Sequence, residues 1–186
     1  MTTALAMISG GLDSILAAKL VKEQGIEVIG ICFKSHFFNE KNAIKMTKQI
    51  GIPLEVVDFS DIHFKMVKNP KHGYGKNMNP CIDCHAMMMR QCGELLEKFH
   101  ADFIITGEVL NQRPMSQNRS ALDIVKNESG IGRKILRPLC AKNLNPTEME
   151  IEGLIDREVL LDISRLLARL EQQPGIISAR RLVQGN

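Results

Sequence analysis

ALAMISGGLDS, residues 4–14, is the stretch of sequence that decides the fold. Ala4 to Ile8 is a short apolar run, which predicts a buried strand. The segment from Asp13 to Gln24 carries apolar residues at helical spacing and is followed by Gly25, so it predicts a helix. A strand that ends in a glycine-rich turn and leads into a helix forms an anion site, because the first amides of the helix are unpaired and point outward. The stretch therefore predicts a strand–turn–helix unit that binds phosphate.

Beyond this unit, strands and helices continue to alternate along the chain. Strands are predicted at Glu27–Phe33 and Leu54–Phe59, with a helix at Asn39–Ile50 between them. The patterns then predict one more helix and two more strands: Cys81–His100, Ala101–Thr106 and Lys134–Leu139. Strands that alternate with helices need crossover connections, which give a parallel sheet covered on both faces. We therefore expect an α/β fold with a doubly wound, mostly parallel five-stranded sheet.

The residues of the glycine-rich turn suit phosphate binding in different ways. Gly10 and Gly11 can adopt conformations closed to other residues and leave room for a phosphate beside the main chain. Ser9 and Ser14 add hydroxyl donors. Asp13 would repel a bare phosphate, so its presence predicts a Mg²⁺ ion that bridges it to the phosphates. The turn lacks the lysine of a Walker loop and the spacing of a dinucleotide fingerprint; the alternative interpretation is a tight turn with Asp13 as helix cap.

A second informative stretch is Asn79-Pro80-Cys81-Ile82-Asp83-Cys84-His85. Pro80 suits a helix start, which places Cys81 in the first turn, where the helix dipole favours a thiolate. Cys84 lies one turn further on, on the same face. Two thiols so placed can form a redox pair, hold a metal, or supply one nucleophile and its partner, and simple packing is the remaining alternative.

A metal centre would draw on a wider set of ligands. Cys81, Cys84 and His85 offer three of the four ligands of a closed zinc site, and the last two are adjacent and diverge. An iron–sulfur cluster held by Cys81, Cys84 and Cys140, with one open iron position, is a further option.

The composition indicates a globular chain of 186 residues, with 44% hydrophobic and 24% charged residues. The lack of Trp and the single Tyr weigh against a dedicated single-strand nucleic-acid binder, and the mild net charge of +3 does not by itself demand a nucleic-acid partner. No secretory signal and no apolar run of membrane-spanning length is present, so we expect a cytoplasmic protein without membrane contact. Cys32 and Cys92 lie in core-like sequence and are predicted to act as small hydrophobic residues.

The glycine-rich turn resembles the Ser-Gly-Gly-x-Asp-Ser signature of the PP-loop (N-type) ATP pyrophosphatases. Members of that superfamily fold as a doubly wound parallel sheet of the adenine nucleotide alpha hydrolase type. They bind ATP, transfer AMP to a carbonyl oxygen of the substrate and release pyrophosphate. By this resemblance the turn holds the pyrophosphate end of Mg-ATP, and backbone near Ile31–Lys34 holds the adenine. The ATP-binding residues it implies are Ser9, Gly10, Gly11, Leu12, Asp13, Ser14, Phe33 and Gly107.

The cysteine stretch resembles the catalytic cysteine region of tRNA 2-thiouridylases and related single-domain tRNA thiolation proteins. Thr106-Gly107-Glu108 stands where those enzymes carry Thr-Gly-His, and Ser116-Gln117-Asn118 is similar to their Asp-Gln-Ser segment. The resemblance covers residues 4–142. The second catalytic cysteine of those enzymes lies further along, and Cys140 is the later cysteine available here.

The resemblance implies a tRNA sulfurtransferase that uses ATP. A base carbonyl is adenylated, and sulfur arrives as a persulfide passed on by a donor protein, or as sulfide on an open cluster iron, and displaces AMP. The implied catalytic residues are Asp13, Cys81, Cys84 and Cys140. The alternatives are an amidating PP-loop enzyme that uses ammonia and a non-catalytic partner protein that binds a nucleotide or a cluster.

Two regions are expected along the chain. Residues 1–143 form the ATP-binding catalytic domain, and residues 144–186 form a C-terminal helical extension and tail. The amphipathic segment Glu148–Leu170 would pack on the core or pair with a second subunit, which favours a homodimer. Basic residues are expected to meet tRNA phosphates: Arg113, Arg119, Arg133, Lys134 and Arg137.

Overall fold

The computed structural model describes residues 2–74, 80–113 and 116–163. Its centre is a single sheet of five strands in the order β3-β2-β1-β4-β5, and every neighbouring pair is parallel. The strands are β1 (Thr3–Met7), β2 (Glu27–Lys34), β3 (Leu54–Asp58), β4 (Phe103–Ile105) and β5 (Ile135–Leu136). The predicted five-stranded parallel α/β fold is therefore confirmed.

The strand order contains one reversal. The chain first builds outward from β1 to β3, then returns to add β4 and β5 on the other side of β1. Crossover segments on either side of such a reversal diverge, and this leaves a crevice outside the carboxyl ends of the central strands. The crevice is expected where β1 and β4 end.

Apolar side chains cover both faces of the sheet. Along β4, Phe103 and Ile105 join one buried cluster, whereas Ile104 joins the other. Adjacent residues of a strand point to opposite faces, so this division shows that neither face is left to solvent. All three side chains are essentially inaccessible to solvent.

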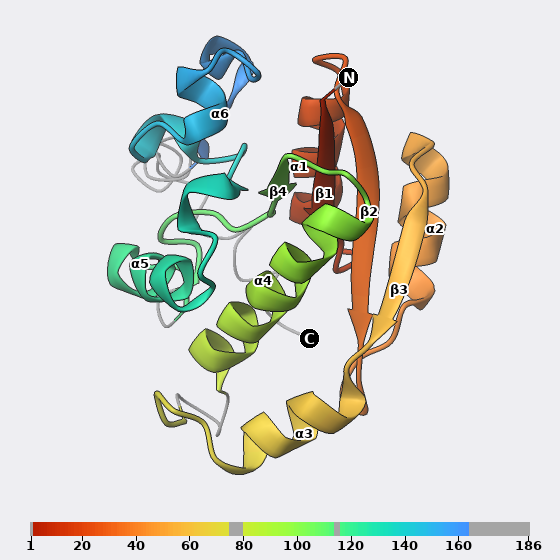
Figure 1. The fold of residues 1–186 in the computed structure, drawn as a ribbon, viewed down its shortest axis with the longest axis vertical. Coiled ribbons are helices and arrows are strands. Elements are labelled where there is room, and N and C mark those ends of the chain that lie inside the picture. The colour runs from red at the N-terminus through yellow and green to blue at the C-terminus, as the bar shows by residue number, and fades with distance from the viewer. Residues whose placement is uncertain (1, 75–79, 114–115, 164–186) are drawn as a thin grey trace, which may run out of the picture.

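Six α-helices lie around the sheet in the described residues. In Figure 1, α4 crosses in front of the sheet while α1 lies behind it, and α2 flanks β3. Ala17 of α1 and Ala43 of α2 belong to one cluster, and Met89 of α4 belongs to the other. The helices are α1 (Leu12–Lys22), α2 (Lys41–Ile50), α3 (Ser60–Lys68), α4 (Cys81–Lys98), α5 (Arg119–Glu128) and α6 (Glu148–Ile151).

The sequence did not predict two of these helices. α3 follows β3 directly, and α5 lies within the polar stretch between β4 and β5. The start of α5 has a recognisable signal, because the Asn118 side chain accepts a hydrogen bond from the amide of Ala121 at 2.9 Å.

The predicted fifth strand was too long. Only Ile135 and Leu136 pair with β4, because Gly132–Lys134 forms a 3-10 turn before them. Chain reversal follows soon after, and the amide of Cys140 bonds to the carbonyl of Arg137. The short strand still brings Arg137 to the carboxyl edge of the sheet.

The segment predicted at Glu148–Leu170 is only partly described. α6 has four residues and is followed by Gly153, at φ 72°, and by a 3-10 turn at Arg157–Val159. Residues 164–170 and the predicted tail at Gln172–Asn186 lie outside the described residues. None of the helices in the described ranges has the length and apolar character needed to cross a bilayer.

Candidate active site

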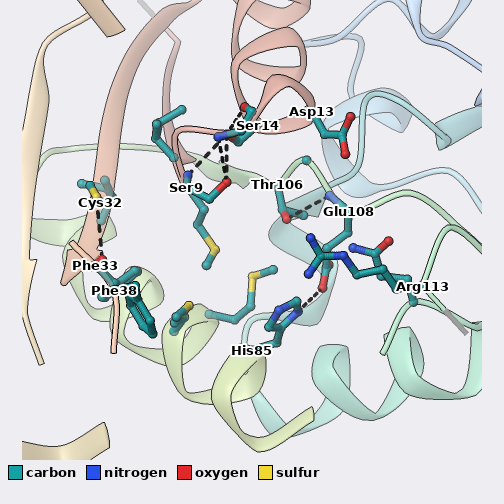
Figure 2. A pocket seen from close by; sticks show the side chains of 18 of the residues that line it. Ser9, Asp13, Ser14, Cys32, Phe33, Phe38, His85, Thr106, Glu108 and Arg113 are labelled. Carbon is teal, nitrogen blue, oxygen red and sulfur yellow. Dashed lines mark hydrogen bonds and ion pairs between the residues drawn. The ribbon is translucent and has the colours of Figure 1, made fainter. Parts of the chain in front are cut away.

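A cavity of about 330 Å³ opens at the carboxyl ends of β1, β2 and β4, at the reversal of strand order. In Figure 2, the loop serines lie on one side and Phe33 and Phe38 on another, with His85, Glu108 and Arg113 gathered on a third. An apolar wall beside a polar, charged wall suits a ligand that combines a flat ring with an anionic tail. The residues that line the cavity include Met7, Ile8, Ser9, Gly11, Asp13, Ser14, Ile31, Cys32, Phe33, Phe38, Asn39, His85, Met88, Met89, Thr106, Gly107, Glu108, Arg113 and Gln117.

The glycine-rich turn between β1 and α1 is tightly closed. Gly10 has φ 81°, and a Cβ atom there would lie 2.7 Å from the backbone nitrogen of Ala43, so the position requires glycine. The buried Ser14 hydroxyl donates to the carbonyl of Gly11 at 2.9 Å and accepts from the amide of Ser9 at 3.3 Å. These bonds hold the turn in one shape before any ligand binds.

The start of α1 is left open toward the cavity. Gly11 is the N-cap residue and supplies no side chain to satisfy the first amides. The alternative interpretation of Asp13 as the cap is therefore wrong, and its carboxylate instead accepts a hydrogen bond from Nε2 of Gln112 at 3.1 Å. Uncapped amides at a helix start, with the positive end of the helix dipole behind them, favour a phosphate at this point.

Gly107 brings the turn after β4 into contact with the same helix start. A Cβ atom on Gly107 would lie 2.5 Å from the backbone nitrogen of Ser14 and 2.7 Å from the carbonyl carbon of Asp13. The absence of a side chain at Gly107 thus lets the ends of β1 and β4 form one continuous wall of the cavity.

A buried ionic group forms the polar floor. Nε of Arg137 donates to Oε2 of Glu108 at 2.9 Å, and Nδ1 of His85 lies 2.9 Å from Oε1. Glu108 and Arg137 are both buried, and the His85 side chain is 25% exposed. Burial by itself raises the pKa of Glu108, but the Arg137 guanidinium and the His85 ring outweigh it and lower the pKa from 4.5 to about 2. Glu108 is thus a fixed negative charge.

The basic residues predicted to meet tRNA phosphates separate into two groups. Arg137 is only 7% exposed and is spent on Glu108, so its prediction as a surface contact is wrong. Arg113 is exposed and lies beside Glu108 at the cavity (Figure 2). Arg119, Arg133 and Lys134 are exposed outside it.

The cysteine pair begins α4, as predicted, but does not line the cavity in the part of the chain that the structure describes. Sγ of Cys84 lies 3.4 Å from Nε2 of His63, a buried ring stacked on Phe59 at 4.9 Å. Burial, then the neighbouring Cys81 and Asp83, raise the pKa of Cys84 to about 12, and burial lowers the pKa of His63. Cys84 is therefore a neutral thiol beside the neutral imidazole of His63.

The other cysteines are buried. Cys140 is fully inaccessible, its thiol donates to the backbone carbonyl of Glu108 at 3.5 Å, and burial raises its pKa. Cys32 and Cys92 lie in the core, as predicted. Within the described ranges, no three His, Cys, Asp or Glu side chains gather closely enough to hold a metal ion. These residues therefore do not fit the predicted three-cysteine iron–sulfur centre.

The structure gathers most of the predicted ATP-binding residues around one cavity. Ser9, Gly11, Asp13, Ser14, Phe33 and Gly107 line it. Leu12 is 73% exposed and lies outside the lining, and Gly10 shapes the turn by its contact with α2. Sequence reasoning missed the joint role of His85, Glu108 and Arg137, because the three come from different elements and meet only in the fold.

Known families and proteins match much of the chain. Residues 1–154 match the model of the family described as thiamine biosynthesis protein (ThiI). The tRNA-specific 2-thiouridylase MnmA of Sulfurimonas denitrificans is 35% identical over 115 residues, which are 55% of this chain and 33% of that protein. MnmA of Helicobacter acinonychis is 34% identical over 138 residues, 66% of this chain and 40% of that protein. The chain thus spans a third to two fifths of the length of these relatives.

Solved structures share the fold. A 4-thiouridine synthetase in complex with RNA and ATP is 21% identical, with a TM-score of 0.58, over 85% of this chain and 42% of that chain. The NH3-dependent NAD synthetase of Campylobacter jejuni is 16% identical, with a TM-score of 0.50, over 96% of this chain and 81% of that chain. At these identities the likeness establishes the common architecture.

Proposed function

The chain belongs to the thiamine biosynthesis protein (ThiI) family, and from this premise we propose that it adenylates a carbonyl oxygen of a tRNA base with ATP and then delivers sulfur to that base. The observation that carries the proposal is the uncapped start of α1 behind the Gly10-Gly11 turn, which faces a cavity at the reversal of strand order. Relatives named as 2-thiouridylases, and a neighbour that binds both RNA and ATP, support the choice of substrate.

In this proposal the chain holds ATP across the cavity. The first amides of α1 and the Ser9 hydroxyl face the pyrophosphate end, and the apolar wall at Phe33 and Phe38 receives the adenine. The backbone of Gly107 packs directly against the start of α1, so this wall would lie beside the α-phosphate. Arg113 beside the cavity adds a positive charge for phosphate oxygens.

The donor set at the turn fits a magnesium ion. Mg²⁺ is usually held by one or two carboxylates together with the phosphates of a substrate, and Asp13 is a partly exposed carboxylate at the cavity. Bound there, magnesium would neutralise the charge that builds up on departing pyrophosphate.

We propose that sulfur transfer uses the thiols at the start of α4. Cys81 lies in the first turn and is only partly buried, so it can accept a sulfane sulfur from the persulfide of a donor protein, whose own thiolate is the leaving group. Cys84 rests as a neutral thiol beside His63 and would act as its partner. Cys140 is fully buried, so it would take part only if the chain around it rearranged to expose its thiol.

The remaining expectations belong to the same proposal. Residues 1–143 would form the catalytic domain, and residues 144–186 an extension that supports a homodimer in the cytoplasm. Ile151 of α6 is 76% exposed, which is consistent with a second subunit that covers this apolar side chain in a homodimer.

Pyrophosphate release tests the proposal directly. The full chain would be incubated with Mg-ATP, a donor protein that carries a persulfide and a pool of unmodified tRNA transcripts, and both pyrophosphate and thiolated bases would be measured. We expect tRNA-dependent release from the unaltered chain, and from Cys81→Ser release without thiolation. Cys92→Ser is the matched control: Cys92 is a buried cysteine further along α4 and does not line the cavity, so this variant should retain both activities.

Three results would speak against the proposal. No release from the unaltered chain, with tight ATP binding, would favour a non-catalytic nucleotide-binding protein. Full thiolation by Cys81→Ser would exclude that thiol as the sulfur carrier. Activity that needs ammonia and survives the double change Cys81→Ala and Cys84→Ala would favour an amidating enzyme.

A further inference from the structure

Adenylation of a base carbonyl releases a proton, and the chain must supply an acceptor for it. The carbonyl oxygen attacks the α-phosphorus, the bond from that phosphorus to the bridging oxygen breaks, and pyrophosphate leaves with the bonding pair. In a lactam such as uracil, the adjacent ring N–H then loses its proton, because the N–H electron pair becomes the C=N bond of the adenylated base. A group in the cavity must accept that proton as the oxygen attacks.

Three of the ionisable side chains in the cavity wall, those of Arg113, Cys32 and Asp13, are poorly suited to accept this proton. The Arg113 guanidinium donates hydrogen bonds and has no lone pair that could accept a proton. Burial, followed by Glu40, raises the pKa of Cys32 to about 11, so its thiol holds its own proton. Asp13 faces the phosphate end and is committed there to Gln112 and to the proposed magnesium ion.

Glu108 is excluded by its own contacts. One carboxylate oxygen faces Nδ1 of His85 and the other accepts from Arg137, and the pKa of about 2 makes the carboxylate a very weak base. Its environment stabilises the charged form and opposes protonation. Of the ionisable residues that line the cavity within the described ranges, His85 is the one left.

The geometry prepares His85 for proton transfer. Since Glu108 is ionised above about pH 2, Nδ1 of His85 carries the hydrogen and donates it across the 2.9 Å contact. The neutral ring then has its lone pair on Nε2, the nitrogen on the opposite side of the ring. Figure 2 shows the ring at the cavity with its dashed contact to Glu108 behind it. A carboxylate that accepts the hydrogen of one ring nitrogen fixes the tautomer and orientation of an imidazole.

Arg137 completes the arrangement from the end of β5. Its guanidinium holds the second oxygen of Glu108 at 2.9 Å, and both side chains are buried, so the carboxylate cannot rotate away from His85. The three residues come from α4, the turn after β4 and the end of β5. Their order from the interior to the cavity is Arg137, Glu108 and His85.

We infer that His85 is the catalytic residue that accepts the ring proton of the base through Nε2, and that Glu108 and Arg137 are positioning residues that orient it. This inference rests on the proposed adenylation. It also explains why this chain has Glu108 where the thiouridylases carry a histidine. Here the imidazole comes from His85 of α4, and the turn supplies the carboxylate that orients it.

The test compares two substitutions at His85 in the full chain. His85→Asn keeps an amide hydrogen for Glu108 but removes Nε2, and His85→Ala removes the whole ring. We expect both to lower tRNA-dependent pyrophosphate release by about 100-fold or more, the usual contribution of a general base, with the Kd for Mg-ATP unchanged within about twofold. Free imidazole should restore release to His85→Ala in proportion to its concentration. Glu108→Gln should lower kcat more than it changes the KM for ATP, without recovery in imidazole. His36→Ala, an exposed histidine outside the cavity, is the matched control.

The possible results separate clearly. Release by His85→Ala within about threefold of the unaltered chain would overturn the inference. Loss of activity in both variants without any recovery in imidazole, while Mg-ATP still binds, would overturn it as well, because the ring would then be structural. Loss of Mg-ATP binding in both variants would assign His85 to nucleotide binding instead. If the unaltered chain itself releases no pyrophosphate, the proposed function fails, and that is seen before any variant is compared.

Discussion

The contact between Gly107 and the start of α1 offers a sharp test of how the cavity is built. A Cβ atom in Gly107→Ala would lie 2.5 Å from the backbone nitrogen of Ser14, whereas ordinary contacts begin near 3.4 Å. The three nearest atoms all belong to the backbone of Asp13 and Ser14, so no side chain can rotate aside. The helix start or the turn after β4 must move by roughly 1 Å, at a cost of about 1–3 kcal/mol in unfolding free energy.

The same displacement should weaken nucleotide binding. The amides of α1 would no longer face the phosphates in the original geometry, and a misplacement of about 1 Å at a reacting centre can cost about 100-fold. We therefore expect the Kd of Gly107→Ala for Mg-ATP to rise by about 10- to 100-fold. Titration calorimetry gives the Kd, and urea unfolding followed by circular dichroism gives the stability.

Gly93→Ala provides the matched control. Its Cβ would lie 2.9 Å from Cγ2 of Ile131, a side chain that can adjust, and the site is on α4 away from the cavity lining. It should lower stability modestly and leave the Kd for Mg-ATP unchanged. If folded Gly107→Ala binds Mg-ATP as tightly as the unaltered chain, the assignment of this wall to the phosphates is wrong.

Four further predictions follow from the same geometry. Below its ordinary pKa of 4.5 the unfolded chain protonates Glu108, but the folded chain does so only near pH 2. As the pH is lowered from 4.5 to about 2, the free energy of unfolding should therefore decrease, by up to about 3 kcal/mol more than in Glu108→Gln. Equal pH slopes of the two chains in urea unfolding would contradict this. Arg137→Met removes the guanidinium from one oxygen of the buried Glu108 carboxylate and should cost about 3–5 kcal/mol in the same assay, whereas a cost below about 1 kcal/mol would show the pair to be unimportant. Because the pKa of Cys84 is raised to about 12, mass spectrometry should find it largely unmodified by iodoacetamide at pH 8 unless urea is added, and rapid labelling of the folded chain would contradict its neutral state. Asp13→Asn should bind ATP similarly with and without magnesium, while the unaltered chain should bind it more tightly with magnesium; an unchanged magnesium effect would remove Asp13 as the ligand.

The fold was largely predictable because its first half uses strong local signals. Short apolar runs predicted the first three strands, and segments of helical spacing that are followed by Gly25 or Gly51 predicted both connecting helices. Gly51 indeed ends α2 in the left-handed conformation at φ 62°. α3 was missed because it begins at Ser60, almost directly after β3, and the residue in the N-cap position, Phe59, has no side chain that can cap a helix. The strand order could not be predicted, since nothing local to β4 says on which side of β1 it pairs.

The site was predictable only where one segment carries it. The turn from Ser9 to Ser14 gathers its donors within six residues, so the pattern alone indicated phosphate. The ionic group did not have this property. Arg137 looked like a surface cation, and Glu108 like a simple departure from the family turn, because their contact depends on β5 pairing next to β4. Long-range contacts of this kind follow from topology, which the sequence pattern did not settle.

The measurement that tests the central claim most directly is competition between pyrophosphate and ATP. If the uncapped amides of α1 hold the leaving end of the nucleotide, magnesium pyrophosphate should displace Mg-ATP from the full chain at a single site, while adenosine should compete far more weakly. Mg-ATP binding that is unaffected by saturating pyrophosphate would contradict the account, because the phosphates would then lie away from the Gly10-Gly11 turn.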